Sequence, residues 1–191
     1  MSRVEVFQKA VRKYFDFLAA HDFTVSKERV EGEACFLTYS SPRVSILLCY
    51  GLPEYHAELA FWLKGVSEFN LCVGDLDVVG QRSEFWKAAP NTDGVEAEVS
   101  YLASAVRSVE EKLCSGDLQF YELLTSARKA AIAEWRQKEK LMAIRSQAEA
   151  AWKSKRYAEV VKLYSAEISN LTALEKKRLA YAEKQVSLAA R

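Results

Sequence analysis

The sequence predicts an α+β fold in which an N-terminal helix packs on a four- or five-stranded antiparallel sheet, followed by a mostly α-helical C-terminal half. Two observations support this prediction. Apolar residues recur every three or four positions up to about residue 20, alternate up to about residue 64, and return to the helical spacing after residue 94. Turn residues also recur about every ten positions between residues 22 and 64, which is typical of an antiparallel meander.

The first elements follow from these patterns. Residues 4–20 carry apolar side chains on one helical face, and the hydroxyl of Ser2 can cap the first turn. Four strands separated by short turns are expected at residues 23–30, 34–40, 44–50 and 55–64. The next segment is less regular: residues 69–73 form either a fifth strand or the lead into a short helix at residues 75–79, and residues 83–89 are expected to add a helical turn.

The second half has helical periodicity throughout. A loop at residues 90–94 is the expected boundary between an α+β domain (1–92) and a helical region (93–191), which either stand apart or pack as one unit. We expect a helix at residues 95–113 that ends at Gly116, and a long helix at residues 118–153 that is capped by Asp117. Residues 136–140 contain no apolar residue, so the long helix either runs free of the core there or breaks.

Both faces of the predicted sheet are apolar. The first face carries Tyr55, Ala57, Leu59, Phe61 and Leu63, and we expect it to form the core. The second face is expected to carry Cys35, Leu37, Tyr39, Leu47, Cys49, Ala60 and Trp62. A solvated face would be more polar, so either helices of this chain or another protein cover it. The candidate partner-binding residues are Glu54, His56, Glu58, Trp62, Leu37 and Tyr39.

The sequence offers few residues for catalysis. Glu54, His56 and Glu58 share one strand face and are either a divalent-metal site or a polar strand end. Asp75 and Asp77 are either a metal-binding pair or a cap of a short helix. Neither phosphate-binding glycine loops nor a nucleophile elbow occurs in the sequence. We therefore expect no enzymatic activity, no bound metal and no cofactor.

The cysteines and the hydropathy indicate a cytoplasmic protein. Cys35, Cys49, Cys72 and Cys114 are widely spaced and match neither a disulfide framework nor a zinc site, so reduced thiols are expected. The sequence has no apolar run of the roughly 18 residues that a membrane helix needs. The N-terminal segment carries charges throughout and lacks the features of a secretory signal.

The net charge of +1 conceals an asymmetry between the halves. Residues 1–126 carry 12 Lys/Arg and 19 Asp/Glu (net −7), whereas residues 127–191 carry 15 Lys/Arg and 7 Asp/Glu (net +8). The halves either attract each other within one fold or bind charged partners. Nucleic-acid binding by the basic region 127–191 is one such alternative, because Trp152, Tyr157 and Tyr164 are interleaved with its cations.

Two resemblances point to protein binding. The segment AWKSKRYAEVVKLYSAE within residues 148–185 resembles a single tetratricopeptide-repeat hairpin, with Tyr157 and Tyr164 at aromatic positions. It departs from the family pattern at Lys155, where the family has glycine, and at Val160, where it has alanine. The chain is also similar in general character to bacterial immunity proteins. The resemblances imply a protein-binding module without catalysis, whose partner is another protein such as a cognate toxin.

Overall fold

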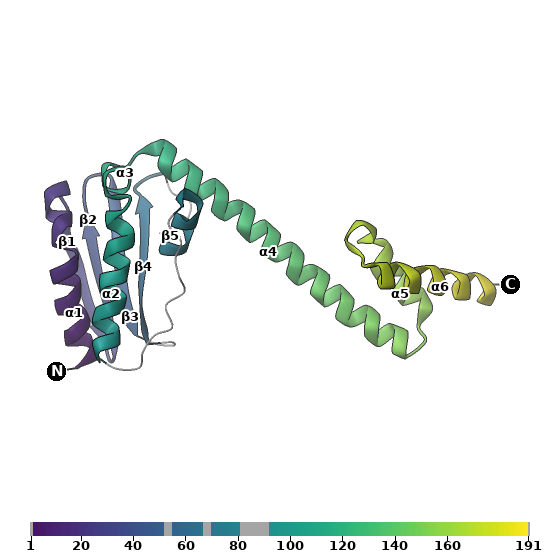
Figure 1. The fold of residues 1–191 in the computed structure, drawn as a ribbon. Helices are drawn as coiled ribbons and strands as arrows, with labels where there is room; N and C mark the ends of the chain where they lie inside the picture. Colours follow the sequence, from purple (N-terminus) through teal and green to yellow (C-terminus); the bar gives the residue numbers. More distant parts are fainter. Residues whose placement is uncertain (1, 52–54, 67–69, 81–91, 191) are drawn as a thin grey trace. The chain divides into compact units, whose positions relative to one another are not determined.

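The chain forms two compact units, each with its own buried core. The computed structural model describes residues 2–51, 55–66, 70–80 and 92–190 (Figure 1). Unit 1 comprises Met1–Lys129 and unit 2 comprises Ala130–Arg191. Helix α4 (Leu118–Lys153) contributes its first turns to the core of unit 1 and its last turns to the core of unit 2. The expected boundary near residue 92 thus differs from the division into compact units, because the helices that follow it pack on the sheet.

The sheet of unit 1 is a five-stranded antiparallel meander, in the order β1-β2-β3-β4-β5. Its strands are β1 (Thr24–Glu31), β2 (Ala34–Ser40), β3 (Val44–Gly51), β4 (His56–Leu63) and β5 (Leu71–Cys72). Leu37 pairs with Leu48, and Leu48 pairs with Leu59, so one face carries a row of leucines across three strands. The sheet thus includes the fifth strand that the sequence left open. A 3-10 helix, η2 (Val73–Val79), follows this strand directly.

Two helices lie side by side on the leucine-bearing face (Figure 1). Helix α1 (Arg3–Tyr14) begins with a capping box in which the Ser2 hydroxyl accepts from the Glu5 N–H, as the sequence predicted. It ends earlier than expected, and a 3-10 helix, η1 (Asp16–His21), completes the segment. Helix α2 (Thr92–Arg107) begins inside the segment that was expected to be a loop. The turn predicted at residues 83–89 lies outside the described residues.

The helix predicted at residues 95–113 is interrupted. Helix α3 (Glu110–Ser115) follows α2 after a break at Ser108, whose hydroxyl donates to the carbonyl oxygen of Ala105 at 2.6 Å. Serine competes with helical hydrogen bonds in this way, which explains a break without Gly or Pro. Gly116 then ends α3 with φ 68°, and the Asp117 carboxylate accepts from the N–H groups of Gln119 and Phe120 at the start of α4, as predicted.

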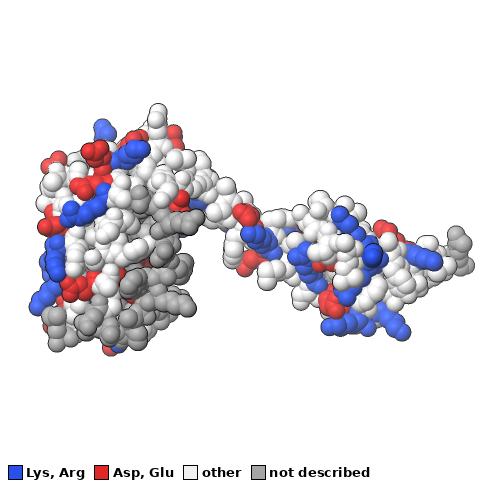
Figure 2. All heavy atoms as spheres, viewed as in Figure 1, with Lys and Arg blue, Asp and Glu red and all other residues white. Residues whose placement is uncertain are grey.

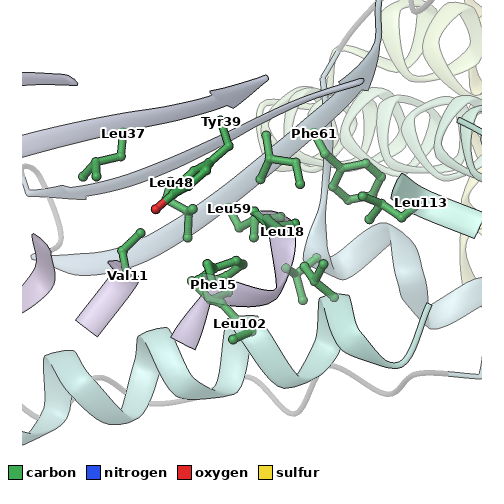
Figure 3. Close-up of a cluster of buried hydrophobic side chains, with 14 of the residues drawn as sticks. Val11, Phe15, Leu18, Leu37, Tyr39, Leu48, Leu59, Phe61, Leu102 and Leu113 are labelled. Atoms are coloured by element: carbon green, nitrogen blue, oxygen red, sulfur yellow. The ribbon is translucent and has the colours of Figure 1, made fainter. Parts of the chain in front are cut away.

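The core of unit 1 lies between the sheet and these helices. Figure 3 shows Val11, Phe15 and Leu18 directed toward Leu48 and Leu59 of the strands, with Leu102 contributed by α2. At the β4 side, Phe61 meets Tyr121 of α4 edge to face, with ring centroids 6.0 Å apart. These contacts join the first turns of α4 to the sheet.

Unit 2 is a small helical assembly. Helix α4 is continuous through residues 136–140, where the sequence left open a break. The hairpin then consists of α5 (Tyr157–Ser165), a 3-10 turn η3 (Ile168–Asn170) and α6 (Ala173–Ala189). Its core is built from Ala148, Ala151, Val160, Tyr164, Leu171, Leu179 and Ala182. Among the described residues, none of the helices has the combined length and apolar character that crossing a membrane requires.

Candidate functional site

The second face of the sheet, here called the open face, is the main candidate site. Helices α1 and α2 both pack on the leucine-bearing face, and α4 meets the open face at its β5 edge, where Arg128 Nη1 lies 3.5 Å from Cys72 Sγ. The open face carries Phe36, Thr38, Leu47, Cys49, Glu58, Ala60 and Trp62. All of these side chains are half-buried except Glu58, which is exposed.

The structure corrects the expected face for two candidate residues. Leu37 and Tyr39, like Cys35, were expected on the face that carries Trp62, but all three lie on the covered face: Cys35 and Leu37 are 0% exposed and Tyr39 is 8% exposed. Phe36 and Thr38 take their places on the open face. A shift of one residue exchanges the two faces of a strand, and the apolar composition of β2 is compatible with either assignment. Trp62 and Glu58 lie on the open face as expected.

One end of the open face is charged. The His56 Nε2 atom lies 3.1 Å from the Glu58 Oε1 atom, and the Cys49 thiol lies 3.9 Å from Glu58 Oε2. Glu54, the third member of the predicted group, lies outside the described residues. Within the described residues, no group of three His, Cys, Asp or Glu side chains is arranged to hold a metal ion. The His56–Glu58 pair places an imidazole and a carboxylate side by side at this end of the open face.

The opposite end of the open face is a row of hydroxyl groups. Ser26, Ser40 and Ser45 are linked by two hydrogen bonds of 3.1 Å, and Ser45 pairs with Trp62 in the register of β3 and β4. On β1, the Arg29 guanidinium lies 4.7 Å from the ring centroid of Phe36. The open face thus has an apolar centre between two polar ends.

Three thiols of unit 1, those of Cys35, Cys49 and Cys114, are poorly suited to nucleophilic chemistry. Burial raises the pKa of Cys35 and Cys49 to about 11 and that of Cys114 to about 12. Thiolates are the reactive form of cysteine, and such pKa values keep these side chains protonated near neutral pH.

Asp75 has a structural partner on both sides. Its carboxylate accepts from the Cys72 N–H at 2.6 Å and pairs with Arg128 of α4. It therefore caps η2 and links this short helix to α4. For Asp75, this agrees with the expected cap of a short helix.

A hollow of about 600 Å³ lies between η1 and the junction of α2 and α3. In it, His21 Nε2 and Glu110 Oε1 are 2.7 Å apart, and Arg107 and Lys112 also line the walls. The hollow is a shallow surface feature whose charged residues are largely exposed. The His21–Glu110 contact links η1 to α3.

Unit 2 is basic, and its carboxylates are largely used within the unit. Residues 130–191 carry 13 Lys/Arg and 7 Asp/Glu, a net charge of +6. Lys140 pairs with the buried Glu167 at 2.6 Å, and Arg145 pairs with the buried Glu175 at 2.7 Å. In the described part of unit 2, five lysines have no ion-pair partner: Lys155, Lys162, Lys176, Lys177 and Lys184. Figure 2 shows basic side chains gathered on the visible face of this unit.

The aromatic residues of unit 2 pack against each other. Trp152, Tyr157 and Tyr181 form an edge-to-face triangle with centroid separations of 5.5–5.8 Å. The Arg178 guanidinium lies 5.5 Å from the centroid of the Trp152 ring. These contacts occupy ring edges and one ring face, which leaves less of the cluster for stacking on nucleic-acid bases.

Comparison with known proteins identifies no relative of this chain. No protein-family model matches the sequence, and neither a curated protein nor a solved structure shows significant similarity to the chain.

Proposed function

We propose that this protein is a non-catalytic protein-binding module and that unit 1 meets its partner through the open face. One observation supports this most directly: the apolar centre of the open face (Phe36, Leu47, Ala60 and Trp62) remains accessible, whereas the other face is buried along β2, β3 and β4. Antiparallel sheets with one solvated face normally present polar side chains there. Contiguous accessible apolar residues on a folded domain are typical of interaction surfaces.

The polar ends of the open face suit the same role. Interfaces commonly combine an apolar centre rich in aromatic residues with a polar rim that fixes orientation. Trp62 is the best candidate for an energetically dominant contact, because tryptophan is enriched among such residues. The hydroxyl groups of Ser26 and Ser40 and the His56–Glu58 pair would form the rim.

We further propose that the partner is basic, as expected if the protein neutralises a cognate bacterial toxin by masking it. Residues 1–129 carry 14 Lys/Arg and 19 Asp/Glu, so unit 1 has a net charge of −5. Complementary charge accelerates association and favours a basic partner over an acidic one. The variant Glu58→Lys should then weaken binding, and unchanged affinity would remove this end of the open face from the interface.

The decisive experiment compares variants of the tagged protein in capture from a nuclease-treated native lysate, read by mass spectrometry. Leu47→Glu and Trp62→Glu place a charge on the open face, and Leu123→Glu changes an equally apolar exposed residue elsewhere in unit 1. We expect one stoichiometric protein to be retained by wild type and Leu123→Glu and lost from both open-face variants. Equal capture by all four folded proteins, or no stoichiometric protein at all, would contradict the proposal. Circular dichroism establishes that each variant is folded.

Nucleic-acid binding through residues 127–191 is a second candidate, favoured by the net charge and the unpaired lysines of unit 2. It predicts that the protein shifts an oligonucleotide in a gel at low salt and that the affinity falls steeply as salt is added. Absence of a shift at low salt would exclude this candidate.

A further inference from the structure

Helix α6 carries a second apolar line in addition to the one that packs in unit 2. Glu175, Leu179 and Ala182 face the unit's interior and are buried. Leu174, Tyr181 and Leu188 are 61%, 47% and 54% exposed. Residues seven positions apart lie on nearly the same side of a helix, so these three form a line about 21 Å long.

Two unpaired lysines complete this line. Lys177 and Lys184 alternate with the apolar residues at steps of three and four positions, which is the spacing of a seam between two packed helices. Neither lysine has an ion-pair partner among the described residues. The five residues Leu174, Lys177, Tyr181, Lys184 and Leu188 are called the α6 seam below.

The α6 seam is held in place by the rest of unit 2. Tyr181 contacts the rings of Trp152 and Tyr157 at 5.5 and 5.7 Å, so its side chain is already positioned. Tyr157 also lines a mostly apolar hollow of about 590 Å³, whose other wall is formed by Gln185, Val186 and Ala189 near the end of α6. The hollow adjoins the seam and can accept an apolar side chain of a partner.

The charges of the seam decide which partner fits. A second copy of the chain, packed antiparallel along the seam, would bring Lys177 of one copy against Lys184 of the other, which places cations in contact without compensation. A nucleic acid would satisfy the lysines but leave Leu174 and Leu188 without a role. An amphipathic helix with acidic side chains opposite the lysines satisfies both features at once.

We propose that the α6 seam docks an acidic amphipathic helix of another protein. The partner helix supplies apolar residues at three- and four-residue steps to contact Leu174, Tyr181 and Leu188, and carboxylates to pair with Lys177 and Lys184. This surface lies in unit 2 and does not rest on the open face of unit 1.

The test uses the full chain and two synthetic helical peptides of about 28 residues, long enough to be helical in water. Both peptides have leucine at the positions that meet the apolar residues; one has glutamate and the other lysine at the positions that meet Lys177 and Lys184. Binding is measured by fluorescence anisotropy. We expect the wild type to prefer the acidic peptide and the variant Leu174→Gln/Leu188→Gln to bind it at least about tenfold more weakly.

Charge reversal supplies the sharper comparison. Lys177→Glu/Lys184→Glu should lose the acidic peptide and prefer the basic one. Lys162→Glu/Lys176→Glu makes the same change in net charge outside the seam and should alter the affinity by less than about threefold. Because both variants carry the same net charge, a reversal of preference confined to Lys177→Glu/Lys184→Glu cannot arise from net charge alone.

Several outcomes would overturn the proposal. These are no binding of the acidic peptide, equal losses in the two charge-reversed variants, or tighter binding of a single-stranded oligonucleotide than of the acidic peptide. A dimer in sedimentation experiments that dissociates in Leu174→Gln/Leu188→Gln would instead assign the seam to a second copy. The same α6 variants are also tested in the capture experiment from lysate. If all of them retain the partner of the open face, a negative result with the peptides leaves the proposed function of unit 1 intact.

Discussion

Glu98 on α2 is a buried carboxyl group that the sequence patterns did not identify. It is 5% exposed, its Oε2 atom accepts from the Ala57 N–H at 2.8 Å, and its Oε1 atom has no hydrogen-bond partner. Burial raises the pKa of Glu98 above its ordinary value, although the Ala57 N–H and the nearby His56 act in the opposite direction. Glu98 thus links α2 to the start of β4, although burial makes its ionised form unfavourable.

The variant Glu98→Gln should change how stability depends on pH. The folded state holds the Glu98 proton more tightly than the unfolded chain does, because the pKa of Glu98 is raised by folding. The resulting contribution to the free energy of unfolding is fully present below pH 4.5 and is lost as the pH rises through the raised pKa. Glutamine cannot ionise, so the variant should gain stability relative to wild type as pH rises. Urea unfolding at several pH values from about 4 to 8 measures this difference.

Glu96, two residues away on the same helix, is the matched control. Hydrogen bonds from Lys13 and Tyr14 lower the pKa of Glu96, so its contribution is present above its ordinary pKa and is lost as pH falls. Glu96→Gln should therefore lose stability relative to wild type as pH rises. Slopes of the same sign in the two variants would contradict the assignment.

Lys155 has a left-handed backbone conformation, with φ 55°. It follows the end of α4, where the Arg156 N–H bonds to the Ala151 carbonyl and the Lys155 N–H bonds to the Trp152 carbonyl. This arrangement favours glycine, because a side chain at positive φ is strained. Lys155 stands where the tetratricopeptide resemblance places glycine, although the resemblance itself stays a prediction.

Lys155→Gly should stabilise unit 2 by about 1 kcal/mol, since it removes the strain of the left-handed residue. Ala150→Gly, inside α4, should lose about 1 kcal/mol because it adds backbone freedom to the unfolded chain without relieving strain. Chemical denaturation followed by circular dichroism compares both variants with wild type. A loss of stability in Lys155→Gly would show that the side chain makes a compensating contribution.

At the scale of the element, β3 shows how a single strand serves two surfaces. Ile46, Leu48 and Tyr50 face the helices and are buried, whereas Leu47 and Cys49 lie on the open face. Alternation along a strand is a local property, but the choice of covered face depends on the residues that each strand meets across the sheet.

This division predicts different costs for two adjacent leucines. Leu48→Ala leaves a cavity in the core and should destabilise unit 1 by about 2–5 kcal/mol. Leu47→Ala removes a side chain that water already reaches and should cost less than about 1 kcal/mol. Equal losses in urea denaturation would indicate that the open face is covered as fully as the other.

Helix α6 of unit 2, like β3 of unit 1, has side chains on two different surfaces. One side packs in the unit, beginning with a capping box between Thr172 and Glu175, and the other side carries the α6 seam. A helix with apolar residues on two sides is suited to lie between two neighbours. The rest of unit 2 packs against one side of α6, and a partner helix would pack against the other.

At the scale of the whole molecule, the two cores share no buried residue among those that the structure describes. The core of unit 1 ends with Leu124 of α4, and that of unit 2 begins with Ala148 of the same helix. Each unit has ion pairs of its own, such as Arg12–Glu28 in unit 1 and Arg145–Glu175 in unit 2. Separate cores favour separate opening.

Tyr164→Ala should therefore loosen unit 2 alone. Tyr164 is 2% exposed, and its loss should cost about 3–5 kcal/mol within that core, as for other large aromatic residues. Hydrogen exchange should accelerate in α5, α6 and the last turns of α4, while β2, β3 and β4 keep their protection. Faster exchange in the strands would show that the units unfold together.

The sequence by itself determined what depends on neighbours along the chain. The Ser2 and Asp117 caps, the end of α3 at Gly116 and the alternating strands are set by local hydrogen bonds and side-chain periodicity. The break at Ser108 and the early end of α1 escaped this reasoning, because helical spacing continues through both positions.

Only the tertiary structure decided which face of β2 is buried, which carboxylates of unit 2 are paired and which side of α6 remains open. Leu37 and Phe36 are both apolar, so the register with β3, not the pattern of β2, places one inside and the other outside. Glu167 and Glu175 meet their cations across 27 and 30 residues of chain. These outcomes depend on contacts between distant segments, and local periodicity carries no information about which segments meet.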